Sequence, residues 1–165
     1  MKLAGLKTIA AVALLVSLAC ATSAAEGPTV VQGAQQSLEV APDATVRLCV
    51  ERGDVLVRGV EGRQLRASAA GAARIELRRP ANMPSAGPAK SVEVSAADER
   101  GVAGCSFSGS VSLDVPRGST VVVKTVLARV SVSDVSVARV ETVSGEVNLQ
   151  GISRSAEASS ANGDL

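Results

Sequence analysis

A short repeat in the C-terminal part of the chain limits the folds that are possible. Residues 123–130, 140–147 and 158–165 align with one another. The period of this repeat is roughly 17 to 18 residues, whereas helical-pair repeats need more than about 30 residues per unit. Two short strands and their turns fit into the shorter period, and stacked units of this kind pair backbone to backbone and enclose a continuous interior. The repeat therefore predicts a parallel β-solenoid (β-helix) over 121–165. The alternative is an antiparallel meander whose short strands resemble one another only in composition.

The composition favours an all-β fold with a Val-lined interior. The 165 residues include no His, Trp or Tyr and a single Phe. Val has a stiff side chain that suits pleated strands. Alternating segments recur from residue 37 onward, separated by predicted turns at 42–44 and 51–54 and by a proline-rich loop at 80–90. We expect one β domain over 37–165, built from short Val-rich strands.

The repeat stops in the middle of a unit, at residues 162–165. A solenoid that ends there exposes a row of unpaired backbone N–H and C=O groups. We expect either a chain that is truncated at its C-terminus or an edge completed by another copy or by an envelope protein.

The N-terminal segment 1–25 has the features of a helical signal peptide. A short basic region is followed by an apolar run over 9–19, which is too short to span a membrane. Small side chains at 23–25 predict cleavage after Ala25, with 26–36 left as a flexible lead-in. The sequence therefore predicts export to the periplasm or cell surface of a bacterium.

Cys20 offers an alternative to simple cleavage. Residues 17–20 partly resemble the box in which a bacterial lipoprotein cysteine is lipidated, although Leu18 lies one place later than that pattern prefers. A membrane association is expected only if Cys20 is lipidated; otherwise Cys20 is removed with the leader.

Two further cysteines, Cys49 and Cys105, remain in the exported part. Two cysteines in an oxidising compartment predict one disulfide, and the alternative is a pair of buried free thiols. No Cys-x-x-Cys spacing is present, so a redox-active role is not expected.

The residue inventory argues against an enzyme. The absence of His removes nucleophile systems that depend on it and nearly all ordinary catalytic zinc sites. We assign no catalytic, cofactor or metal site. With 17 basic against 16 acidic residues and no aromatic stacking platform, nucleic-acid binding is not expected either.

Three patterns have both a functional and a structural interpretation. Glu146 and Asp164 occupy equivalent positions and could form a stacked carboxylate pair, although solvated turn residues are the simpler interpretation. Residues 52–54 spell Arg-Gly-Asp, which we interpret as a turn between strands. A locally basic stretch could contact anionic envelope polymers or form a solvated strand face; it comprises Arg58, Arg63, Arg66, Arg74, Arg78 and Arg79.

Three segments, 52–59, 113–118 and 142–151, resemble the bacterial "putative adhesin" family of exported β-solenoid proteins. The resemblance covers roughly residues 37–165 and rests on short motifs rich in turn residues. It implies a solenoid, export and no established enzymatic activity. We therefore expect a non-enzymatic envelope protein that is a structural or adhesin-like interaction module. The alternative is a glycan-binding or glycan-active solenoid.

Overall fold

The computed structural model describes residues 35–71, 74–81, 86–97 and 105–162. All regular structure in these ranges is β, and none of their residues form a helix long and apolar enough to cross a membrane. The predicted signal peptide, its cleavage site Ala25 and the lipidation candidate Cys20 lie outside the described residues. The strands are β1 (Gln35–Val60), β2 (Gln64–Ala70), β3 (Arg74–Arg78), β4 (Ala89–Ala97), β5 (Ser110–Pro116), β6 (Thr120–Ser133), β7 (Val137–Ser144), β8 (Val147–Gln150) and β9 (Ser155–Asn162).

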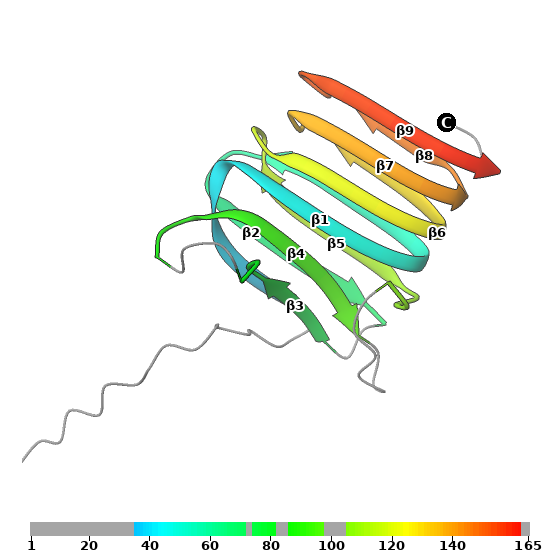
Figure 1. The fold of residues 1–165 in the computed structure, drawn as a ribbon, viewed down its shortest axis with the longest axis horizontal. Helices are drawn as coiled ribbons and strands as arrows, with labels where there is room; N and C mark the ends of the chain where they lie inside the picture. Colours follow the sequence, from blue (N-terminus) through cyan, green and yellow to red (C-terminus); the bar gives the residue numbers. More distant parts are fainter. Residues whose placement is uncertain (1–34, 72–73, 82–85, 98–104, 163–165) are drawn as a thin grey trace, which may run out of the picture.

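The nine strands form one mixed sheet that is bent back on itself, so that two layers face each other (Figure 1). The first layer contains β4, the first half of β1, the first half of β6, β7 and β9, all parallel. The second layer contains β5, the second half of β1, the second half of β6 and β8, also parallel. Two strands add to this sheet in an antiparallel manner at the end of the molecule that lies opposite β9. β3 pairs with β4, and β2 lies between β5 and residues 35–39 of β1, which are not in a parallel ladder.

The register of the ladders reproduces the alignment seen in the sequence. Val123 is paired with Val140, its equivalent in the next repeat, and Val140 is paired in turn with Ala158. Val130 is likewise paired with Val147 in the second layer. These ladders are parallel, so an antiparallel meander is wrong for this part of the chain.

Two predicted turns are wrong, because both lie inside the long strand β1. At residues 42–44 the chain stays extended, and the irregularity that Pro42 introduces appears as a register shift against β4 between Val40 and Thr45. At residues 51–54 the strand bends without ending, because Gly53 adopts a φ of 124°. The bend takes β1 from the first layer into the second. β1 also begins at Gln35, inside the predicted lead-in.

The core lies between the two layers and is filled mainly by valines. Alternate residues of β1 and β6 point inward, which places Val46, Val57, Val123 and Val132 at 0% exposure. The single aromatic residue, Phe107, is also buried. A core of small branched side chains thus runs between the two layers from β4 and β5 to β7 and β8.

Candidate functional site

The edge strand β9 is a candidate interaction site, because in the described residues it pairs with β7 only. Its other side therefore presents backbone donors and acceptors to solvent (Figure 1). Natural edge strands usually carry lysines, prolines or bulges that prevent further pairing. β9 has none of these and consists of Ala, Ser and Asn, with Glu157 as its one charged residue.

Among the described residues, the interior is incompletely closed at the same end. Leu149, Ile152 and Ala158 pack against the buried core but are themselves only partly buried. In the rung before them, the equivalent residues Val132, Val135 and Val140 are almost fully buried. An added strand next to β9 would cover Ala158. Leu149 lies in the second layer on β8, which among the described residues pairs with β6 only.

The predicted disulfide is confirmed. Cys49 and Cys105 are bonded, with their Cα atoms 4.7 Å apart. Cys49 lies on the outer face of β1, which is the central strand of the first layer. The bond therefore attaches the chain segment before β5 to the outside of that layer. This attachment is a structural role for both cysteines.

The Arg-Gly-Asp tripeptide forms the bend of β1. A Cβ on Gly53 would overlap the backbone of Gly109, so glycine is required at this corner. Arg52 contacts the neighbouring Glu51 at 3.7 Å, and Asp54 contacts Arg129 of the next rung at 3.6 Å. The three residues thus form a bend within β1, whereas the structural interpretation predicted a turn between two separate strands.

Glu146 lies in the same corner column, and its nearest charged partner is a cation. Arg129 lies between Asp54 and Glu146, with its Nε 3.5 Å from the Glu146 carboxylate. Both side chains are more than half exposed. The other member of the predicted carboxylate pair, Asp164, lies outside the described residues. A solvated carboxylate beside an arginine resembles a surface ion pair more than a catalytic acid.

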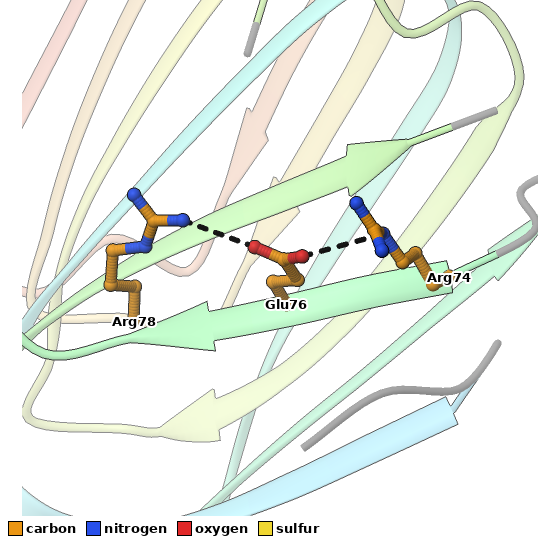
Figure 2. A network of polar contacts seen from close by, with 3 residues as sticks. All are labelled: Arg74, Glu76 and Arg78. Carbon is orange, nitrogen blue, oxygen red and sulfur yellow. Dashed lines mark hydrogen bonds and ion pairs between the residues drawn. The ribbon is translucent and has the colours of Figure 1, made fainter. Parts of the chain in front are cut away.

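A buried carboxylate that sequence reasoning missed lies on β3. Figure 2 shows Glu76 between Arg74 and Arg78, with ion-pair distances of 3.3 and 3.2 Å. The Glu76 side chain is only 9% exposed, whereas that of Arg78 is 62% exposed. The Arg-x-Glu-x-Arg spacing was a usable signal, since residues two apart on a strand share a face. The arrangement neutralises Glu76 and leaves one net positive charge.

The basic stretch of the sequence does not form one surface. Arg58 and Arg66 lie in the second layer, where each is paired across a ladder with Asp114. Arg74 and Arg78 lie on β3, which extends the first layer. Among the described residues, no group of three or more His, Cys, Asp and Glu side chains could hold a metal ion.

Comparisons with known proteins give one distant structural neighbour. No family model matches the chain, and no curated protein matches it either. A crystal structure from Clostridium sporogenes, described as a "putative cell adhesion protein", matches with a TM-score of 0.40 and 7% sequence identity. The match covers 79% of this chain and 98% of that one.

Proposed function

We propose that this protein is a non-enzymatic, exported envelope protein that acts as an adhesin-like interaction module. Its binding surface is the outer edge of β9, which takes up another β-strand. The observation that carries this proposal is an edge strand without lysine, proline or a bulge, beside an interior that is only partly closed among the described residues. Strand addition would satisfy the backbone groups of the edge and cover the half-open interior beside Ala158 in one step.

The partner strand in this proposal is β9 of a second copy. A two-fold dimer brings the same patch of both subunits together, so the patch must be self-complementary. A strand of small neutral residues can pair with itself in an antiparallel manner without steric conflict, and Glu157 is its one charge. The apolar end of one interior would then face the apolar end of the other.

The repeated rungs support a parallel β-solenoid as the architecture of this module. Its rungs are β4 with β5, β1, β6, β7 with β8, and finally β9. The disulfide supports export, because such bonds persist in oxidising compartments such as the bacterial periplasm and cell surface. The solvated, arginine-paired state of Glu146 supports a role without catalysis.

The proposal is tested by the oligomeric state of the purified chain, measured by light scattering over a range of concentrations. The decisive variant is Ala158→Lys, which places a charge at the half-open end of the interior. Lysine at this partly buried position can extend into solvent in the monomer, whereas a paired copy would bury it. We expect the wild type to dimerise with increasing concentration and Ala158→Lys to remain monomeric.

The matched control is Ser159→Thr, on the same strand but pointing outward. Ser159 is exposed and lies opposite Glu141 in the ladder, so the added methyl group leaves both the apolar end and the charge of the edge unchanged. We expect this variant to dimerise like the wild type. A wild type that stays monomeric at all concentrations would refute the proposal, as would equal association of the Ala158→Lys and Ser159→Thr variants.

A further inference from the structure

The outer face of the first layer carries a cationic trough, which is a site separate from the β9 edge. The trough is an open depression of about 690 Å³ that crosses β3, β4, β1, β6 and β7. Its charged lining consists of the cations Arg47, Arg78, Lys124 and Arg139 and the anions Glu93 and Glu141. The lining therefore has four positive and two negative charges, an excess of two positive charges.

Three of these cations lie in one row across the strands. Along this row, successive ladder partners are Arg78, Glu93, Arg47, Val122 and Arg139. Arginines thus occupy every second strand. Adjacent strands lie about 4.8 Å apart, so successive arginines of the row are about 10 Å apart along the axis on which the rungs stack.

The arginines of the row differ in their ion-pair contacts. Arg47, the central one, has no ion-pair partner in the part of the chain that the structure describes, although Glu93 is its ladder neighbour. Arg139 contacts Glu157 at 3.4 Å, and Arg78 contacts the buried Glu76 (Figure 2). The pair formed by Arg139 is exposed on both sides, and exposed pairs contribute little and exchange partners readily.

Lys124 adds a fourth cation in the next row, beside the disulfide. Its Nζ lies 2.8 Å from Glu141, and Cys49 is its ladder partner on β1. Cys49 and Cys105 both line the trough, so the disulfide forms a fixed wall at this point. The arginine row therefore lies on a rigid, cross-linked part of the sheet.

We propose that this trough binds a linear anionic polysaccharide that carries one carboxylate per disaccharide. The spacing of the arginines along the row is comparable with the length of a disaccharide, so successive carboxylates would meet Arg78, Arg47 and Arg139 in turn. Guanidinium groups match carboxylates through paired hydrogen bonds. No Trp or Tyr exists to stack on sugar rings, so charge supplies the recognition.

The test is binding of hyaluronan oligosaccharides, which have this carboxylate spacing, measured by calorimetry at low and at physiological salt. Arg47→Gln combined with Arg139→Gln removes two cations of the row. The matched control, Arg58→Gln with Arg66→Gln, removes the same charge from the second layer. We expect the first pair to weaken binding about tenfold and the second pair to change it little.

Further measurements test whether the carboxylates of the polymer supply the recognition. Binding should weaken as salt rises, because the contacts are exposed. Neutral dextran should not bind, and hyaluronan whose carboxylates have been reduced to alcohols should not bind either. The proposal is overturned by absence of hyaluronan binding at low salt, by equal losses in the two double variants, or by equal binding of the carboxyl-reduced polymer.

Discussion

Gly145 lies directly against the backbone of Ala128, so that a Cβ on Gly145 would overlap the Ala128 carbonyl oxygen. Gly145 also has a φ of 133°, which L-residues rarely adopt. We expect Gly145→Ala to lower the free energy of unfolding by about 3 kcal/mol or more, since both strain and backbone overlap must be relieved. Chemical denaturation of the purified variant measures this change.

The variant Gly62→Ala separates the effect of backbone strain from that of backbone overlap. Gly62 has a similar φ of 119°, but nothing lies within 4 Å of an added Cβ. Gly62→Ala should lower the free energy of unfolding by about 1–2 kcal/mol, from backbone strain alone. Equal losses at Gly62 and Gly145 would contradict the close stacking of the corner.

The disulfide is expected to stabilise the fold substantially. Cys49 and Cys105 are 56 residues apart, and closing a loop of this length restricts the unfolded chain by about 4 kcal/mol in the chain-entropy description. The double variant Cys49→Ala with Cys105→Ala should therefore unfold at a much lower denaturant concentration. Reduced wild-type protein is the control and should unfold at the same denaturant concentration as the double variant. An unchanged midpoint would show that the bond does not constrain the unfolded chain.

Much of the C-terminal architecture was predictable, because its repeats are adjacent in the sequence. The alignment of the repeats gives the ladder partners of Val140 directly. The position of β1 was not predictable from periodicity, since its ladder partners on β6 are far from it in the sequence, as with Thr45 and Thr120. Between β1 and β6 in the sequence, the chain forms β2, β3, β4 and β5, which lie on the side of β1 that faces away from β6.

The turn errors and the site have a similar physical origin. Turn residues such as Gly53 indicate a change of direction, but they do not show whether the strand ends or continues into a second layer. The cationic trough could not be predicted from the sequence for a related reason. Arg78, Arg47 and Arg139 are distant from one another in the sequence and are aligned only by the strand pairing. The pairing of Cys49 with Cys105 could be predicted, because the third cysteine, Cys20, lies in the predicted signal peptide.

Phe107 is expected to be the most sensitive single position of the core. Its side chain is 2% exposed, and its carbonyl oxygen accepts a hydrogen bond from the backbone N–H of Glu51 at 2.9 Å. Phe107→Ala should cost about 3–5 kcal/mol, because it leaves a large cavity in a core of small residues. Phe107→Leu should cost less, about 1–2 kcal/mol. Thermal or chemical unfolding distinguishes the two; similar small losses would mean that the ring is not packed.

Arg129 and Val130 are neighbours in the sequence, but replacing each with alanine should change the free energy of unfolding by very different amounts. Arg129 is exposed and joins Asp54 to Glu146, so Arg129→Ala should cost less than about 1 kcal/mol, and less still at high salt. Val130 is fully buried, and Val130→Ala should cost about 2 kcal/mol regardless of salt. Denaturation at two salt concentrations checks both values. A larger effect at Arg129 would contradict a solvated corner.

The most direct test of the central claim is an intermolecular distance between two copies of β9. A spin label attached through Ser159→Cys, with the native disulfide intact, would report this distance by pulsed electron resonance. If two β9 edges pair, the labels should lie within a few strand spacings of about 4.8 Å, and the same label at Arg58→Cys should give a clearly longer distance. No short distance at Ser159, under conditions where the chain associates, would contradict strand addition at this edge.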